Sequence, residues 1–148
     1  MVQVSGSKLS LVTRIKVTGN PNKMILDSAQ TNLYVSEDNS DLVDVISTST
    51  NQVLSSISVA GPKDAVGSSL VTYHGFAPNG LTLSPDGKTL YVTVGGTDSL
   101  AVADLTQTPS AVVGLVHTGY YPNDVSVSHD GKMLYVVNAK SVTGPEVI

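Results

Sequence analysis

Three stretches of this chain repeat one another without gaps, and this repeat limits the possible folds more than any other feature. In each stretch a proline lies 13 residues before a tyrosine: Pro21 and Tyr34, Pro78 and Tyr91, Pro122 and Tyr135. The second and third tyrosines are 44 residues apart and the first and second are 57 apart, so 13 extra residues follow the first unit, near 62–74. A period of this length is typical of folds that stack copies of one small unit.

Each unit contains short segments rich in β-branched and alternating residues, which predict strands. They run over 23–26, 32–36, 42–46 and 52–59 in the first unit, and over 80–84, 89–94, 99–105 and 111–117 in the second. The third unit gives two strands, and no segment has a sustained helical period. We therefore predict an all-β fold of β-propeller blades with four antiparallel strands each, comprising two complete blades and parts of others.

The whole chain, 1–148, is expected to be one propeller segment. Its parts are an outer strand of a preceding blade (9–18), a blade (19–61), an insertion (62–76), a blade (77–119) and a partial blade (120–148). An incomplete ring leaves strand edges unpaired. We therefore expect either further blades from a longer chain or a homo-oligomer that closes the propeller.

Composition excludes several classes of function. The net charge is −4 and no stretch is rich in Lys and Arg, so the chain is not expected to bind nucleic acid. It has no cysteine, and no apolar run is long enough to span a membrane. The first eight residues lack the apolar core of a signal peptide.

The segment 84–93, with the sequence SPDGKTLYVT, resembles the core of the YVTN family β-propeller repeat. Segment 128–137 is a near copy with His129 in place of the proline, and 27–36 is a degenerate copy without the Pro-Asp-Gly turn. The sequence GYYP at 119–122, followed by NAK at 138–140, is also similar to propeller domains fused to phosphoesterases of the alkaline phosphatase type. The resemblance implies a periplasmic, secreted or cell-surface protein of a bacterium or archaeon.

Loops at one face of a propeller usually carry the binding residues, because a rigid scaffold holds them. The loops before the first strand of each blade and between its second and third strands share that face. They supply our candidate ligand-binding residues: His74, Phe76, Asn79, Asp98, Tyr120, Tyr121, Asn123 and Asp124. The aromatic members could instead pack between blades, and Asn79 and Asn123 occupy one repeat position, which favours a structural role.

No metal site or cofactor is expected. The three histidines, His74, His117 and His129, fall in an insertion, an outer strand and a turn, too far apart for a shared metal. The acidic loop 37–41 offers oxygen ligands for Ca²⁺ but lacks the spacing of a calcium-binding loop, so a solvated turn is the alternative we favour. No catalytic motif is recognisable, and no residue is assigned a catalytic role.

Two functions remain open from the sequence. The first is a non-catalytic scaffold that binds a protein or small-molecule ligand, and the absence of a catalytic motif makes it our main expectation. The alternative is a segment of a propeller hydrolase, either lactonase-like or the propeller half of a phosphoesterase. Propellers serve unrelated functions, so the fold by itself does not decide between them.

Overall fold

Alternation of apolar and polar residues produces short antiparallel strands in this chain. The computed structural model describes residues 1–61 and 74–140. The strands in these ranges are β1 Val2–Ser5, β2 Lys8–Leu11, β3 Pro21–Leu26, β4 Asn32–Glu37, β5 Leu42–Ser47, β6 Gln52–Ser58, β7 Pro78–Leu83, β8 Thr89–Val94, β9 Ser99–Asp104, β10 Ala111–His117, β11 Pro122–Val127 and β12 Leu134–Asn138. One short 3-10 turn, Gly95–Thr97, follows β8. Most of the predicted insertion, 62–73, lies outside the described residues.

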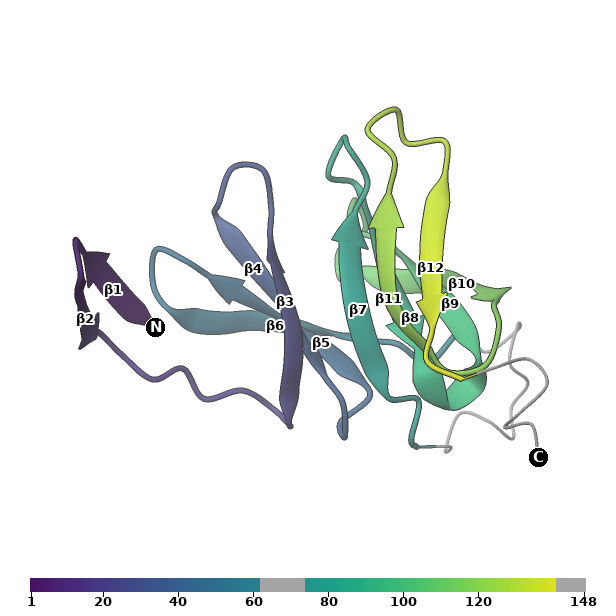
Figure 1. Ribbon diagram of the computed structural model, residues 1–148, viewed down its shortest axis with the longest axis horizontal. Helices are drawn as coiled ribbons and strands as arrows, with labels where there is room; N and C mark the ends of the chain where they lie inside the picture. Colours follow the sequence, from purple (N-terminus) through teal and green to yellow (C-terminus); the bar gives the residue numbers. More distant parts are fainter. Residues whose placement is uncertain (62–73, 141–148) are drawn as a thin grey trace.

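Two complete blades stand side by side (Figure 1). Strands β3 to β6 form the first four-stranded antiparallel sheet, and β7 to β10 form the second. Strands β11 and β12 begin a third unit, and β1 pairs with β2 in a separate hairpin. The architecture is an incomplete β-propeller, which confirms the predicted fold class. Across residues 1–61 and 74–140, no helix is long and apolar enough to cross a membrane.

The segment expected as an outer strand over 9–18 has a different structure. In the part of the chain that the structure describes, strand β2 pairs only with β1, and residues 12–18 are not assigned to a strand. The segment is nevertheless extended in character, since Thr13, Ile15 and Val17 are half-buried while the residues between them are exposed. An outer strand must hydrogen-bond to the third strand of its own blade. Within residues 1–61 and 74–140, no third strand of another blade pairs with this segment.

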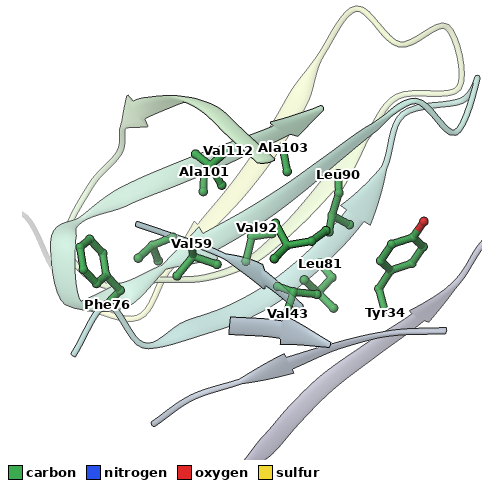
Figure 2. Close-up of a cluster of buried hydrophobic side chains, with 12 residues drawn as sticks. Tyr34, Val43, Val59, Phe76, Leu81, Leu90, Val92, Ala101, Ala103 and Val112 are labelled. Atoms are coloured by element: carbon green, nitrogen blue, oxygen red, sulfur yellow. The ribbon is translucent and has the colours of Figure 1, made fainter. Parts of the chain in front are cut away.

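The main core lies between the first and second blades. Because side chains alternate across a strand, each sheet turns one apolar row toward its neighbour. Val43 and Val59 come from the first blade, and Leu90, Val92 and Ala101 from the second (Figure 2). All five are at most 1% exposed, so water is excluded from the interface between the blades.

The degenerate first repeat forms the same tight turn as its better-conserved copies. Gly87 and Gly131 have φ angles of 69° and 71° in the turns of the second and third units. Gln30 has a φ of 57° at the matching position of the first unit. There the Asp27 carboxylate replaces the missing motif by accepting hydrogen bonds from the amides of Thr31 and Asn32.

Gln30→Gly is expected to raise the free energy of unfolding by about 0.5 kcal/mol. Positive φ costs a residue with a side chain about 1 kcal/mol, and the greater freedom of unfolded glycine offsets part of the gain. Gly87→Ala is expected to lower the same quantity by about 1 kcal/mol, because its added methyl group meets no atom and only φ opposes it. Gly114→Ala is the control, since that site is open and its φ is not positive. Urea unfolding checks all three, and equal losses for Gly87→Ala and Gly114→Ala would contradict the explanation.

Candidate functional site

The first strands of the three units, β3, β7 and β11, share a β-bulge immediately after their initial proline. Pro21 pairs with Glu37 and Met24 with Val35, so three residues of β3 span two residues of β4. The same offset occurs between β7 and β8 and between β11 and β12. A bulge bends the strand and redirects side chains, and it is common beside functional sites. Here it presents one pair of residues per unit: Asn22 and Lys23, Asn79 and Gly80, Asn123 and Asp124.

A hydroxyl group on the second strand satisfies the backbone amide that the bulge removes from the ladder. The Lys23 amide donates to Ser36 Oγ at 3.0 Å, and the Gly80 amide donates to Thr93 Oγ1 at 2.7 Å. Both bonds are largely shielded from water, where an unpaired amide is costly. In the third unit Val137 has no hydroxyl, and Asp124 pairs directly with it instead.

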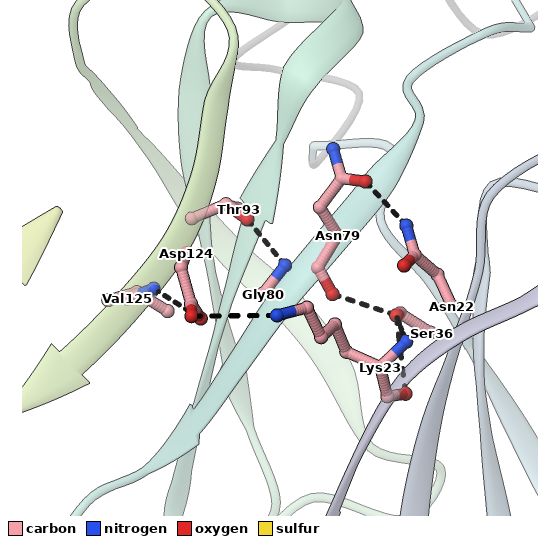
Figure 3. Close-up of polar contacts among 8 residues, drawn as sticks. All are labelled: Asn22, Lys23, Ser36, Asn79, Gly80, Thr93, Asp124 and Val125. Carbon is pink, nitrogen blue, oxygen red and sulfur yellow. Dashed lines mark hydrogen bonds and ion pairs between the residues drawn. The ribbon is translucent and has the colours of Figure 1, made fainter. Parts of the chain in front are cut away.

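Polar contacts cross from blade to blade along the first strands, which gather side by side (Figures 1 and 3). Asn22 Nδ2 donates to Asn79 Oδ1 at 2.7 Å, and Ser36 Oγ donates to the Asn79 carbonyl at 2.8 Å. Lys23 Nζ lies 3.6 Å from Asp124 Oδ2. We call Asn22, Lys23, Asn79 and Asp124 the inner-strand cluster. It joins all three units of the chain.

Gly80 makes room for the ion pair between Lys23 and Asp124, the longest of these contacts. A Cβ atom at this position would lie 2.6 Å from Asp124 Cα and 2.7 Å from its Oδ1, closer than atoms can approach. The third unit therefore packs directly against the backbone of β7. Lys23 extends past Gly80 toward Asp124 (Figure 3), and the two charged side chains remain 48% and 52% exposed. The pair is thus accessible to water and to a small molecule.

The candidate binding residues predicted from the sequence separate into two groups. Asn79 and Asp124 belong to the inner-strand cluster, and Asn123 is an exposed neighbour on β11. The prediction for Phe76 does not fit its position, because its side chain is 2% exposed in the core between the blades. An aromatic ring gains more from that burial than from a polar, hydrated surface.

The remaining candidates lie in the connections between blades. His74 is exposed, with Nδ1 3.5 Å from Asp41 Oδ2. Tyr120 is 49% exposed, and the Lys140 ammonium lies 4.7 Å from the centre of the Tyr121 ring. Asp98 accepts a hydrogen bond from the Tyr121 amide at 2.7 Å. None of these side chains contacts the inner-strand cluster through a hydrogen bond or ion pair described for the chain.

Asp41 and Asp98 are equivalent residues that connect consecutive blades. Both have positive φ, 58° and 49°, at the start of the third strand of their blade. Asp41 accepts the amides of Gly75 and Phe76 at 2.9 and 2.8 Å, and Asp98 accepts the amide of Tyr121. The Asp41 carboxylate in the acidic loop 37–41 therefore links the first blade to the connection before the second, a contact that we call the clasp. Within the described ranges, no three His, Asp or Glu side chains are grouped to hold a metal.

Sequence reasoning missed Lys23, and it expected Glu37 to lie in a solvated acidic loop. Lys23 was assigned to a predicted strand and given no other role. Its alignment with Asp124 in the repeat was the signal that could have identified it. Glu37 ends β4 and is fully buried, and its Oε2 accepts the Gly19 amide at 3.0 Å. Among residues 1–61 and 74–140, its Oε1 finds no hydrogen-bond partner. Burial raises the pKa of this carboxyl group, and the nearby Asp44 carboxylate raises it further.

Glu37→Gln is expected to weaken the pH dependence of stability. A raised pKa in the folded state means that Glu37 contributes most stability below its ordinary pKa of 4.5 and loses that contribution as pH rises through the folded value. Glutamine does not ionise and keeps an acceptor for the Gly19 amide. The free energy of unfolding of the variant, relative to that of the wild type, should therefore increase from pH 4.5 to pH 8. Urea unfolding at these two pH values measures the change.

Asp86→Asn provides a control of opposite sign. The Ser84 hydroxyl and then the Lys88 amide lower the pKa of this exposed carboxyl group. Its contribution is therefore present above its ordinary pKa and lost as pH falls. The variant should lose stability relative to the wild type toward neutral pH. Parallel pH profiles for wild type and Glu37→Gln would contradict the assignment of a raised pKa to Glu37.

Comparison with known proteins identifies the propeller more closely. The family model described as "Lactonase, 7-bladed beta-propeller" matches residues 65–144. No curated protein sequence matches the chain. A solved protein structure from Lactobacillus plantarum is similar with a TM-score of 0.70 and 20% identity, covering 97% of this chain and 48% of that one.

Other similar structures have different descriptions. A putative 6-phosphogluconolactonase from Bacteroides fragilis has a TM-score of 0.66 at 22% identity, covering 83% of this chain and 33% of that chain. Hydrazine synthase from Kuenenia stuttgartiensis has a TM-score of 0.66 at 19% identity, covering 92% of this chain and 32% of that chain. At these identities the likeness shows the fold alone. The chain spans between about a third and a half of these structures.

The main functional expectation from the sequence, a non-catalytic binding or scaffold propeller, is wrong. The matching family is one of lactonases, and its model covers the second blade and the described part of the third unit. The matched residues make up more than half of the chain, which therefore belongs to the lactonase family of seven-bladed β-propellers.

Proposed function

We propose that the full-length protein hydrolyses a lactone, and that this chain supplies one wall of the active site. The observation that carries the proposal is the match of residues 65–144 to the lactonase family. A sugar lactone is the substrate class we favour. Its support is that similar propellers from Bacteroides fragilis and Bacteroides uniformis are described as putative 6-phosphogluconolactonases.

The inner-strand cluster is the part of this chain that suits the reaction best. Ester hydrolysis needs a base to activate water and hydrogen-bond donors or positive charge to stabilise the oxyanion. Asp124 offers an accessible carboxylate, and Lys23 offers an ammonium group beside it. The first strands hold both groups on a rigid scaffold, which favours the fixed geometry that catalysis requires. Residues from blades outside this chain would complete the site.

Two finer assignments accompany this proposal. The repeat is of the YVTN type, supported by the sequence YVT at 91–93 and by the Thr93 hydroxyl, which accepts the amide of Gly80. The protein acts outside the cytoplasm, in the periplasm, at the cell surface or secreted. Support for that location is the resemblance to other propellers of this repeat type.

A titration assay with a panel of lactones tests the proposed activity. The panel comprises neutral and phosphorylated five- and six-membered sugar lactones, each measured against its spontaneous hydrolysis at pH 6.5 to 7. We expect the purified full-length protein to accelerate the release of acid from at least one member. The heat-unfolded protein serves as the control. A folded protein that accelerates none of them would refute the proposal.

A further inference from the structure

We propose that Asp124 is the general base of this reaction and that Lys23 positions it from two blades away. The inference rests on the proposed lactonase function and assigns residues to it. Strands β3, β7 and β11 contain only two ionisable side chains, Lys23 and Asp124. These two residues form an ion pair across the strand that lies between them.

The carboxylate of Asp124 is held at both of its oxygens yet remains accessible. Oδ1 accepts the Val125 amide at 3.0 Å, and Oδ2 lies 3.6 Å from Lys23 Nζ. Half of the side chain is exposed, so a water molecule can approach it. A base with a fixed direction and access to water meets the geometric requirement for abstracting a proton.

Lys23, Gly80 and Asp124 occupy one repeat position in the three units. A position that serves only the fold would tend to keep one residue type in every blade. Here the three units carry a cation, no side chain and an anion, and a side chain at Gly80 would collide with Asp124. An exposed ion pair of this kind contributes little to stability, so stability does not account for the arrangement. Positioning of a reactive carboxylate does.

The reaction follows from these roles with atoms and charges balanced. Asp124 takes a proton from water as the water oxygen attacks the lactone carbonyl carbon and forms a tetrahedral oxyanion. Collapse of the oxyanion breaks the bond between the acyl carbon and the ring oxygen. The departing ring oxygen takes the proton from Asp124, which restores the carboxylate and yields a hydroxy acid. Lys23 keeps its proton throughout and holds Oδ2 in place.

Steady-state kinetics of the full-length protein on a hydrolysed lactone test the assignment. Asp124→Asn keeps an oxygen for the Val125 amide but cannot accept the proton, so kcat should fall by about 100-fold or more. Lys23→Met should lower kcat by about 10-fold with little change in KM, because the base is misdirected while substrate binding is retained. Lys23→Arg should restore most of the loss. Asp86→Asn, in an exposed turn, is the control and should match the wild type.

Each contrary outcome has its own meaning. Near-wild-type kcat for Asp124→Asn, in a wild type that hydrolyses lactones, would overturn the role of Asp124 and leave the proposed function standing. A raised KM with unchanged kcat in Lys23→Met would identify Lys23 as a substrate-binding residue and overturn its positioning role. A wild type that hydrolyses no lactone would remove both proposals. Thermal unfolding checks that each variant is folded. Because the Lys23 and Asp124 side chains are about half exposed, we expect their substitution to leave the fold intact.

Discussion

Leu90→Ala is expected to lower the free energy of unfolding by about 2 to 5 kcal/mol. Leu90 is 0% exposed and lies in the core that the first and second blades share. Truncation removes buried methyl groups and leaves a cavity that two rigid sheets cannot collapse to fill. Because the core joins the two blades, unfolding should remain a single cooperative transition. Its urea midpoint should fall, while the dependence of the unfolding free energy on urea concentration should not change.

Leu54→Ala is the matched control for that prediction. Leu54 lies on the outer strand β6 of the first blade and is 61% exposed. Its truncation should change the free energy of unfolding by less than about 0.5 kcal/mol. A comparable loss in the two variants would mean that the interface between the blades does not hold the chain together. A separate early transition in Leu90→Ala would mean that the blades unfold independently.

The strands were predictable because one pattern occurs in register three times. The segment expected over 89–94 is strand β8, and the one expected over 111–117 is β10, with the same bounds. The turn at Gly87 lies where its sequence placed it. A repeat provides independent copies of each signal, so a weak copy such as 27–36 can be assigned from its stronger relatives. Segment 12–18, which is not assigned to a strand, shows the limit, because strand pairing depends on a partner that the segment does not contain.

The site was less predictable because it is formed between blades. Asn79 and Asp124 were selected for their position near the start of a first strand, and both belong to the inner-strand cluster. Lys23 was missed because its role requires the distance to Asp124 across Gly80, which no local pattern encodes. Phe76 was expected on the exposed binding face, whereas its side chain packs in the core between the blades. Connections lack the alternation that tells the inner from the outer face of a strand, so the direction of an aromatic side chain there follows only from packing.

The acidic loop 37–41 illustrates how tertiary contacts change the meaning of a residue type. Its carboxylates suggested either a calcium site or a solvated turn. Instead Glu37 is a buried strand residue, and Asp41 is 6% exposed with its oxygens facing backbone amides of the next connection. A carboxylate that accepts several amide hydrogen bonds replaces the water those amides lose on burial. This clasp leads to the second large stability effect expected for the chain.

Asp41→Ala is expected to lower the free energy of unfolding by about 3 kcal/mol. The Asp41 carboxylate accepts the amides of Gly75, Phe76 and Ala77 at 2.9, 2.8 and 3.4 Å. Alanine leaves these donors without their charged acceptor, and it must also adopt a φ of 58°. Urea unfolding at neutral pH measures the loss.

Asp98→Ala separates the hydrogen bonds from the backbone strain. Asp98 has a similar φ of 49°, so alanine incurs a similar strain, but its side chain accepts only the Tyr121 amide among the bonds described for this part of the chain. The loss should therefore be smaller than for Asp41→Ala by about 1 kcal/mol or more. Equal losses would attribute both effects to φ and would contradict a clasp made by the carboxylate. A larger loss for Asp41→Ala would mean that the connection before β7 is fixed mainly by a single buried side chain, which holds the second blade, and with it Gly80, in place for the inner-strand cluster.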